Sequence, residues 1–473
     1  MSPVLDKARL SAAILAARVA QAASRTLKRG GGTTYPGVLA RRVDPKVLAK
    51  LSRKLSQGSV AITGTNGKTT TTRMVSDILR SVGVRVANNS TGANLVTGVT
   101  ATLVSNSSLV GKPSSEMGLF EVDEASVPKV AAEADLSLLA VLNLFRDQLD
   151  RYGELAYTAK VIASAFPDLP AGGTVVLNAD DPLVASLGRG AKRPVFFGVE
   201  DPALDTGTLQ HIADSKDCPV CGTALRYKAV YFGHMGVYRC PNCSFARPEA
   251  AYTATRIRMN GPEGTSFVLT TPEGEHEAHI GLPGLYNVYN ALAAAAVAAE
   301  AGVRTESIVR SLEEFGGAFG RVERVRAGDK EVFLLLIKNP VGFNEILRTF
   351  VVSPAAPGAG ATNARHVLIA INDNHADGRD VSWLWDVDFE MLAGKGETRF
   401  SVSGIRAQDM AVRLKYAELS VNNVIPNRKE ALLSALEATP PGEMLYVLPT
   451  YTAMLEIRQT LSDLGYTHPF WED

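Results

Sequence analysis

The sequence carries no excess of charge of either sign. Its 49 lysines and arginines balance 49 aspartates and glutamates, so the formal net charge is zero. A protein that binds nucleic acid through its overall field is basic, so this class is not favoured. No apolar run has the length of a transmembrane helix. Arg18 interrupts the apolar stretch near the start, which argues against a secretory signal.

Cysteine is also scarce, with four in 473 residues, and they form two close pairs. This spacing favours a metal site over disulfides, and it suits a reducing cytoplasm. Cys218 and Cys221 precede Cys240 and Cys243 in the C-x₂-C pattern typical of a tetrahedral zinc ribbon. Four thiolates leave no open coordination position, so the expected zinc is structural. His234 lies between the pairs as an alternative ligand.

A glycine-rich loop is present, and it reads Gly64-Thr65-Asn66-Gly67-Lys68-Thr69-Thr70. It follows a β-rich run and precedes apolar residues at helical spacing, which is the layout of a phosphate-binding loop. The loop is shorter than the common form, because Ile62 stands where the first glycine would be. Glycines let backbone N–H groups approach a polyphosphate, and the helix start favours anions. Lys68 can reach terminal phosphates and the Thr69 hydroxyl can ligand Mg²⁺, so we expect a nucleoside triphosphate site.

The length predicts two or three domains, and the pattern of the chain predicts an α/β fold. Strands alternate with helices from about 55 to 200, which is typical of a parallel sheet, and a second alternating pattern begins near 330. We therefore expect an N-terminal helix and lead-in over 1–50, a central domain over 51–325 with the zinc ribbon inserted at about 205–255, and a C-terminal α/β domain over 326–473. Expected strands are 59–63, 84–88, 118–122, 138–142, 174–178, 195–199, 332–337, 366–371, 398–402 and 444–448.

Polar side chains follow several of these strands, where ligands bind in parallel sheets. Glu121 ends the strand at 118–122 and is a candidate Mg²⁺ ligand. Asn287 and Asn290 are three residues apart, hence on one face of an alanine-rich helix, although Asn287 could instead cap it. Arg321 could clamp phosphate. The stretch Asn178-Ala-Asp-Asp-Pro182 fits either a site or simple turn chemistry.

Two further segments have a function or position that the sequence alone leaves open. Residues 372–386 crowd four aspartates, a glycine and tryptophans after an expected strand, which indicates a site. Residues 1–30 read as a helix with interleaved basic residues. That helix either packs on the body of the protein or lies at an anionic membrane surface on the inner face.

These motifs together resemble those of the Mur ligases, the ATP-dependent amide-forming family of peptidoglycan precursor synthesis. Within that family, several stretches resemble the ligase-like subunits of lipid II isoglutaminyl synthases. The stretches are NLFRDQLDRYGE at 143–154, the four-cysteine insertion, IKNPVGFN at 337–344 and DNHADGRDVSWLWDVDFE at 373–390. The implied fold is a Mur ligase-like central domain with a Rossmann-like C-terminal domain.

The resemblance implies ATP-dependent amidation of the α-carboxyl of D-glutamate in lipid II, giving D-isoglutamine through an acyl phosphate. Lys68 and Thr69 would hold ATP phosphates and Mg²⁺, with Thr70 in support, and Glu121 would ligand Mg²⁺. Asn287 and Asn290 would face the nucleotide and Arg321 the phosphates. Catalytic roles are thus expected for Lys68 and Glu121.

Glutamine hydrolysis by thiolate chemistry needs a nucleophilic cysteine. All four cysteines are assigned to zinc, so a partner must release the ammonia. The resemblance implies a heterodimer with a GatD-type glutamine amidotransferase. It also implies that Asp380 completes the Cys–His pair of that partner, with Asp373 and Asp377 as alternatives.

Three positions depart from the wider Mur pattern. Gln148 stands where many Mur ligases have a histidine, and Lys160 lies near the place of a carbamylated lysine, although an ordinary surface lysine fits it better. No acidic residue precedes Lys338, which favours ammonia over a whole amino acid as nucleophile. An amino-acid-adding Mur or folylpolyglutamate-type ligase is the alternative function. A zinc-bearing ATP-binding scaffold for a partner is a third.

Overall fold

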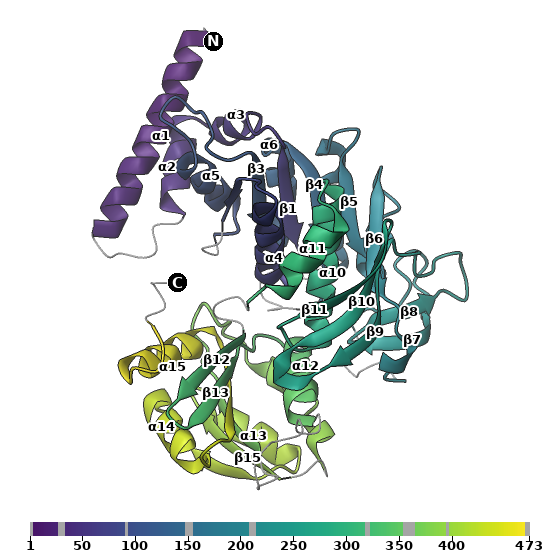
Figure 1. Cartoon of the computed structure of the whole chain (residues 1–473), viewed down its shortest axis with the longest axis vertical. Helices are drawn as coiled ribbons and strands as arrows, with labels where there is room; N and C mark the ends of the chain where they lie inside the picture. Colours follow the sequence, from purple (N-terminus) through teal and green to yellow (C-terminus); the bar gives the residue numbers. More distant parts are fainter. Residues whose placement is uncertain are drawn as a thin grey trace.

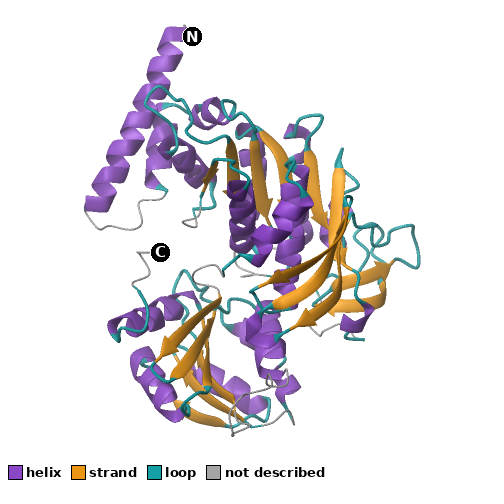
Figure 2. Cartoon of the chain, viewed as in Figure 1, coloured by secondary structure: helices purple, strands orange, loops and turns teal. Residues whose placement is uncertain are grey.

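The computed structural model describes residues 3–26, 34–89, 93–146, 155–207, 214–316, 322–352, 365–393 and 397–468 (Figures 1 and 2). Within these ranges the strands form a nine-stranded sheet, a six-stranded sheet and a two-stranded hairpin. The nine-stranded sheet carries the first two thirds of the chain. The six-stranded sheet carries the last third and lies below it in Figure 1.

The nine-stranded sheet has the order β11-β10-β9-β6-β5-β4-β1-β3-β2. All strands from β9 to β2 along this order run parallel, whereas β10 and β11 add an antiparallel edge. The bounds are β1 Ser59–Thr63, β2 Val86–Asn88, β3 Met117–Glu121, β4 Leu136–Val141, β5 Thr174–Asn178, β6 Pro194–Val199, β9 Tyr252–Met259, β10 Thr265–Thr271 and β11 Gly274–Ile280.

Helices cover both faces of this sheet because its strands are apolar on both sides. In β1, Val60 and Ile62 join one hydrophobic cluster and Ala61 joins the other. The first face carries α4 (Lys68–Ser81), α10 (Leu285–Glu300) and α11 (Thr305–Glu313). The second carries α1 (Pro3–Thr26), α2 (Tyr35–Val43), α3 (Val47–Ser52), α5 (Val96–Ser105), α6 (Val127–Glu133), α8 (Leu155–Ala163) and α9 (Pro182–Leu187).

The six-stranded sheet has the order β12-β13-β17-β14-β15-β16, with all pairs parallel except β12 and β13. Its strands are β12 Val322–Ala327, β13 Lys330–Leu335, β14 Arg365–Ala370, β15 Thr398–Ser403, β16 Val421–Val424 and β17 Met444–Pro449. Helices α12 (Pro340–Ile346) and α13 (Ala407–Tyr416) cover one face, and α14 (Arg428–Ala438) and α15 (Tyr451–Asp463) cover the other.

Short helical turns complete the description. One is a π-helical turn, η5 (Leu347–Val352), which continues α12. The 3₁₀ turns are η1 (Glu124–Ser126), η2 (Phe166–Asp168), η3 (Pro202–Leu204), η4 (Gly261–Glu263), η6 (Ser382–Asp386) and η7 (Phe389–Leu392).

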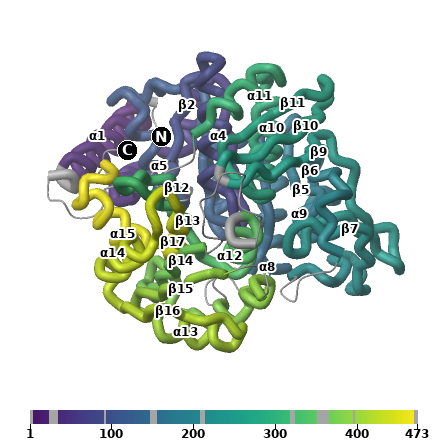
Figure 3. The backbone as a smooth tube through the Cα atoms, turned by 60° about the horizontal axis from the view of Figure 1, so that its bottom comes forward, coloured from purple at the N-terminus to yellow at the C-terminus, as the bar shows by residue number. Residues whose placement is uncertain are grey.

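The two sheets meet at α12. Val341 of α12 is buried in the hydrophobic cluster of the nine-stranded sheet, although the helix belongs to the other sheet. Figure 3 shows α12 on the side of the C-terminal part that faces α4 and α10. The start of α12 therefore lies next to the glycine-rich loop.

The strands expected from the sequence all exist, with bounds shifted by up to two residues. The antiparallel edge β10–β11 and the polar edge strand β16 were not predicted. The domain limits at 50 and 325 stay a prediction, although β12 already pairs within the second sheet from Val322.

The N-terminal helix α1 packs on the body of the protein. Leu10, Ile14 and Ala17 are buried against α2 and α5, which agrees with the simpler of the two readings. None of the described helices is both long enough and apolar enough to span a membrane.

Candidate nucleotide site and cysteine cluster

The glycine-rich loop joins β1 to α4 in a conformation that only glycine tolerates at two positions. Gly64 has φ +131° and Gly67 has φ +87°. A Cβ on Gly67 would lie 2.1 Å from Oδ1 of Asn290, and one on Gly64 would lie 2.9 Å from the Asn143 carbonyl oxygen. The backbone is thus wedged between β4 and α10, with its N–H groups at the start of α4. This is the geometry of an anion cradle.

Two carboxylates lie beside this cradle. Glu121 ends β3, opposite Ile62 of β1 in the parallel register, and its side chain is buried. In the described part of the chain, no hydrogen bond or ion pair reaches its carboxylate. Glu124 of η1 pairs with the Lys68 ammonium at 3.1 Å, and that ammonium also donates to the Gly64 carbonyl at 2.5 Å. A buried, unpaired carboxylate next to a phosphate cradle fits a hard divalent cation such as Mg²⁺.

The predicted pair of asparagines does reach the loop. The Thr71 hydroxyl donates to Oδ1 of Asn290 at 3.4 Å, and Nδ2 of Asn290 donates to Oδ1 of Asn287 at 3.1 Å. Asn287 does not cap α10, because Gly284 holds that position and the Asn287 amide donates back to the Pro283 carbonyl. The two amides therefore lie beside the first turn of α4.

A second network of hydrogen-bonded side chains contacts the loop, and no role was predicted for its individual residues. The Asn66 backbone N–H donates to Oδ1 of Asn143 at 2.9 Å, and Nδ2 of Asn143 donates to the Asn66 carbonyl. From the other sheet, Asn339 donates to Oδ1 of Asn66 at 2.9 Å and Lys338 donates to the Thr65 carbonyl at 3.2 Å. The signal was the two stretches at 143–154 and 337–344, which contain these residues.

A cavity of about 90 Å³ opens between the loop, α10 and α12. That is several times the roughly 10–15 Å³ that one water needs on this measure. Among the described residues, the polar part of its lining consists mainly of amides, and Lys338 is the one charged side chain in it. The lining residues are Asn66, Gly67, Thr70, Asn143, Phe232, Met235, Leu282, Tyr286, Asn287, Tyr289, Asn290, Leu336, Lys338, Asn339, Gly342 and Ile346.

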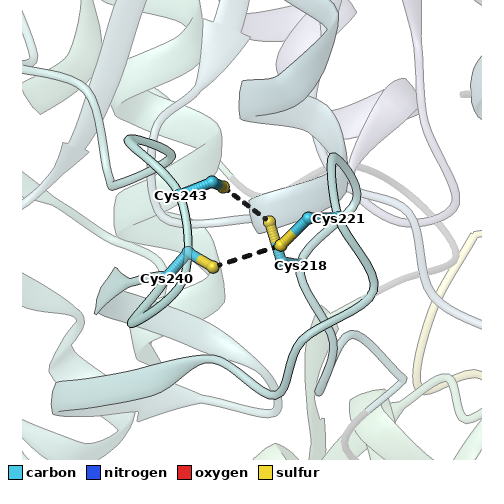
Figure 4. A group of neighbouring side chains, drawn as sticks. All are labelled: Cys218, Cys221, Cys240 and Cys243. Carbon is cyan, nitrogen blue, oxygen red and sulfur yellow. Dashed lines mark hydrogen bonds between the residues drawn. The ribbon is translucent and has the colours of Figure 1, made fainter.

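The four cysteines come together at the base of a hairpin formed by β7 (Arg226–Phe232) and β8 (Met235–Arg239) (Figure 4). Their sulfurs all lie within 4.8 Å of one another. The Sγ atoms of Cys218 and Cys243 are 3.6 Å apart, and those of Cys221 and Cys240 are 3.4 Å apart. A tetrahedral ZnS₄ centre has sulfur separations of about 3.8 Å, whereas a disulfide has about 2 Å. The donor set therefore fits zinc.

His234 is not part of this cluster. It lies in the turn at the opposite end of the hairpin, fully buried, with its ring 4.6 Å from that of Phe145. Its Nε2 is 3.3 Å from Oδ2 of Asp181.

The aspartates at 180 and 181 have structural contacts rather than open carboxylates. Asp181 caps α9 by accepting from the Leu183 and Val184 N–H groups. Asp180 is buried and accepts from Arg247, Tyr289 and the Val199 N–H. Burial raises the pKa of Asp180, while the Arg247 guanidinium opposes that shift. This stretch therefore anchors the hairpin and α9 to the sheet, in line with the turn chemistry considered from the sequence.

The three candidate aspartates of the C-terminal part differ sharply in exposure. Asp377 is buried and accepts from both the N–H and the hydroxyl of Thr452, at 2.7 and 2.5 Å. Asp373 pairs with Arg406 at 2.8 Å. Asp380 is exposed, and the hydrogen bond from the Ser382 N–H lowers the pKa of its carboxyl. Asp380 thus offers an anionic carboxylate at the surface.

Several predicted residues are away from the site or outside the description. Arg321 and Gln148 lie outside the described residues, as does most of the stretch 143–154. Lys160 is exposed and lines a different cavity, near Arg146 and Cys218.

Comparisons with known proteins place this geometry in a family. The family described as Mur ligase middle domain matches residues 62–246 and 226–298, and the family described as MurT ligase C-terminal matches residues 336–454. The pseudomurein peptide ligase type C of Methanothermus fervidus superposes with a TM-score of 0.68 at 22% identity, covering 88% of this chain and 80% of that one. MurF of Acinetobacter baumannii superposes with a TM-score of 0.67 at 17% identity, covering 90% and 81%. These structures show the Mur ligase-like α/β fold with parallel sheets.

The relatives found by sequence identify the family more narrowly than the solved structures do. The lipid II isoglutaminyl synthase (glutamine-hydrolyzing) subunit MurT of Streptococcus pneumoniae is 34% identical over 92% of this chain and 93% of its own length. The subunit of the same name from Staphylococcus aureus is 31% identical over 95% and 97%. The phosphate loop, the carboxylate-bearing strand, the paired asparagines and the C-terminal match agree with these likenesses. The chain belongs to the MurT family of Mur ligases.

Proposed function

We propose that this chain is the ATP-dependent subunit of an amide synthase that converts the α-carboxyl of D-glutamate in lipid II to the amide. The name of the MurT relatives supports this assignment, since they are subunits of lipid II isoglutaminyl synthase. The observation that carries it is the buried, unpaired Glu121 carboxylate beside the cradle of Gly64 and Gly67.

In this proposal the chain activates a carboxylate by positioning and charge neutralisation. The loop N–H groups and Lys68 hold the triphosphate of ATP, and Glu121 and the Thr69 hydroxyl hold Mg²⁺. Bound Mg²⁺ neutralises charge that develops on the phosphates. A substrate carboxylate oxygen attacks the γ-phosphorus, and ADP leaves. Ammonia then attacks the carbonyl carbon of the acyl phosphate, phosphate leaves, and the amide remains after loss of a proton.

Lys68 must change partners in this scheme. Its ammonium now contacts the Gly64 carbonyl and Glu124. A triphosphate in the cradle would draw it away from the Gly64 carbonyl, because an ammonium binds an anionic phosphate oxygen more strongly than a neutral carbonyl oxygen. Arg321 is proposed to face the phosphates on the family match alone.

Ammonia must come from another chain. The four cysteines of the sequence all lie in the cluster, so none is left as a nucleophile for glutamine. We propose a heterodimer with a GatD-type glutaminase, to which Asp380 supplies the third member of a catalytic triad. The exposure of Asp380 supports this choice over Asp377 and Asp373. The exposed rings of Trp385 and Tyr416 lie in the C-terminal part with their centroids 5.3 Å apart. They supply apolar surface for such a partner.

The cysteine cluster is proposed to hold one structural zinc ion. All four sulfurs are needed for a tetrahedron, so the metal would brace the hairpin and do no chemistry. The inserted zinc ribbon, the Rossmann-like character of the C-terminal part and the limits at 50 and 325 belong to this proposal as well.

In this proposal the acceptor substrate is linked to a lipid. The protein would therefore act at the cytoplasmic face of the membrane, where ATP is available. The outer face of α1 supports a peripheral location, since it joins exposed apolar side chains with the exposed cation Lys7. Cosedimentation with phosphatidylglycerol vesicles but not phosphatidylcholine vesicles is expected, and Leu15→Ser with Val19→Ser should abolish it. The exposed apolar side chains are Val4, Leu5, Leu15 and Val19.

One assay separates this function from the alternatives. The purified chain is given ATP, Mg²⁺ and a D-glutamyl acceptor, with either ammonium or a panel of amino acids. ADP release that depends on ammonium supports an amide synthase, whereas dependence on an amino acid would indicate an amino-acid-adding Mur or folylpolyglutamate-type ligase. Amidation that persists after Glu121→Ala in an intact complex would reduce the chain to a scaffold.

A further inference from the structure

The segment that carries Asp380 continues into the 3₁₀ turn η6, and side chains hold this turn at both ends. At its start, the Ser382 N–H donates to Oδ1 of Asp380 at 2.8 Å. At its end, Arg413 of α13 donates to the Leu384 carbonyl at 3.2 Å and to the Val387 carbonyl at 2.5 Å. The last carbonyls of a helical turn have few partners within it, so donors from another element fix where the turn ends.

Arg413 is buried although it carries a charge. It is 4% exposed, and in the described part of the chain Glu390 is the one carboxylate that pairs with it, at 2.9 Å. That carboxylate is largely exposed, so water weakens its attraction to the guanidinium. An apolar side chain of similar volume often stabilises a core as well as a buried ion pair does. Core stability alone therefore does not account for an arginine here, whereas the fixed geometry of its donors does.

Two aromatic rings hold the guanidinium in one orientation. Its central carbon lies 5.3 Å from the ring centroid of Phe389 and 5.7 Å from that of Trp385. Trp385 belongs to η6 and also meets Tyr416, which is on the same helix as Arg413. Such contacts between a cation and aromatic rings restrain the guanidinium in addition to its hydrogen bonds. The donors of Arg413 are thus fixed relative to η6.

The position of the Asp380 carboxylate depends on η6. Within the described residues, hydrogen bonds reach this exposed carboxylate from Ser382 alone. A carboxylate with so few contacts takes its position from the backbone of the turn. If the last carbonyls of η6 lose their donors, the turn can shift, and the carboxylate moves with it. A displacement of about 1 Å can lower a catalytic rate by about a hundredfold.

We propose that Arg413 is a positioning residue, which fixes η6 and thereby orients Asp380 toward the Cys–His pair of the partner. This inference rests on the proposed role of Asp380 in the glutaminase triad. In this role Arg413 touches no substrate and acts only through η6. Its loss should impair the release of ammonia from glutamine and should spare the reaction with free ammonium.

The test uses the complex of this chain with its glutaminase subunit, with the partner in excess, and measures amidation with glutamine and with ammonium. Arg413→Met keeps a long side chain between the two rings but removes every N–H donor. It should lower kcat with glutamine at least about tenfold, and KM for glutamine and the ammonium-driven rate should stay within about twofold. A merely structural side chain would change the two rates equally, since both need the same folded ligase.

Two further variants sharpen the comparison. Arg458 is 2% exposed and lies on α15, which covers the opposite face of the six-stranded sheet. Arg458→Met removes the same donors from a comparably buried site and should leave the ratio of the glutamine rate to the ammonium rate unchanged. Arg413→Lys keeps the charge but loses the planar fork of donors, so its ratio should fall between those of the wild type and Arg413→Met.

Equal loss with both nitrogen sources in Arg413→Met would overturn the inference, and so would an unchanged ratio. If Arg413→Met does not fold, an unchanged ratio in Arg413→Lys would overturn it instead. Asp380→Asn, measured alongside, separates two kinds of failure. If it lowers the ratio while the Arg413 variants do not, the positioning role is wrong and the triad assignment stands. If it leaves the ratio unchanged, the triad assignment fails and this inference with it.

Discussion

The side-chain amide of Asn339 donates a hydrogen bond to Oδ1 of Asn66 at 2.9 Å, and this bond joins the C-terminal sheet to the phosphate loop. Oδ1 of the same asparagine accepts from the Gly342 N–H at 2.9 Å and caps α12. One residue therefore starts the helix between the two sheets and touches the loop. Movement of the loop on nucleotide binding would reach the C-terminal sheet directly.

Two variants of Asn339 separate its two roles. Asn339→Asp keeps an oxygen for the helix cap but removes the donor to Asn66, so activity should fall at least tenfold with little change in stability. Asn339→Ala loses both and should also lower the free energy of unfolding by about 1 kcal/mol. Urea unfolding and ADP release measure the two effects. Full activity in Asn339→Asp would show that the contact with Asn66 has no role in turnover.

The Glu121 carboxylate is the predicted Mg²⁺ ligand, so Glu121→Gln should abolish Mg²⁺-dependent ATP turnover. An amide binds a divalent cation far less well than a carboxylate. Glu116, directly before the start of the same strand, pairs with the exposed Arg85 at the surface, and Glu116→Gln serves as the matched control with near wild-type rate. Comparable loss in the two variants would mean that the strand, and not the ligand, had been damaged.

Asp380 and Asp377 should respond differently in the complex with the glutaminase. Asp380→Asn should stop glutamine-driven turnover and spare ammonium-driven turnover, since only the partner's triad is affected. Asp377→Asn should instead lower stability by about 1–2 kcal/mol, because an amide loses one of the two Thr452 hydrogen bonds. The measurement is the ratio of the amidation rate with glutamine to the rate with ammonium, which should fall in Asp380→Asn but not in Asp377→Asn. If Asp380→Asn lowers both equally, the triad assignment is wrong.

A feature could be predicted from the sequence when its signal lies within a few neighbouring residues, and not when it depends on residues far apart in the chain. The strand 59–63 and its loop were predicted because their signals are local: a β-rich run, glycines and a helix start. The strand β16 was missed because Val421-Asn-Asn-Val424 is a partly polar edge strand with no clear pattern. No strand was expected between 199 and 332, so the antiparallel edge at β10 and β11 was missed as well.

Long-range contacts were beyond the reach of pattern. Asn66 and Asn339 are 273 residues apart, and only folding shows that they meet. The spacing of the cysteines predicted their cluster, but no feature of the sequence placed Phe232 beside the phosphate loop. The role of Asp380 rested on a family match, and the geometry added its exposure relative to Asp377.

Glu345 predicts a pH dependence of stability. It is buried between the two sheets, and burial raises the pKa of its carboxyl to about 7 despite Arg348 at 3.1 Å. As pH rises from about 4.5 to 7, the unfolded chain loses this proton first, so the folded state loses stability over that window. Glu345→Gln mimics the protonated form and should gain on the order of 3 kcal/mol at pH 8 but much less at pH 5.

Urea unfolding at several pH values measures this effect. Glu437→Gln, at an exposed position of α14, is the control and should show no such trend. A stability difference between Glu345→Gln and the wild type that stays constant from pH 5 to 8 would contradict the buried titration.

Loss of the proposed zinc should loosen the hairpin. The purified chain should contain one zinc per molecule by elemental analysis, and Cys218→Ser should remove it and lower the melting temperature by about 5 °C or more. Absence of zinc in a wild-type chain purified without chelators would contradict the proposed site.

Transfer of oxygen from the substrate tests the central claim most directly. The acceptor is prepared with ¹⁸O in the α-carboxyl of its D-glutamate and incubated with the complex, ATP, Mg²⁺ and ammonium. An acyl phosphate requires that one carboxylate oxygen leave with the phosphate, so mass analysis should find one ¹⁸O in each inorganic phosphate released and one in the amide product. Amide formation with unlabelled phosphate would contradict activation of the carboxylate by this chain.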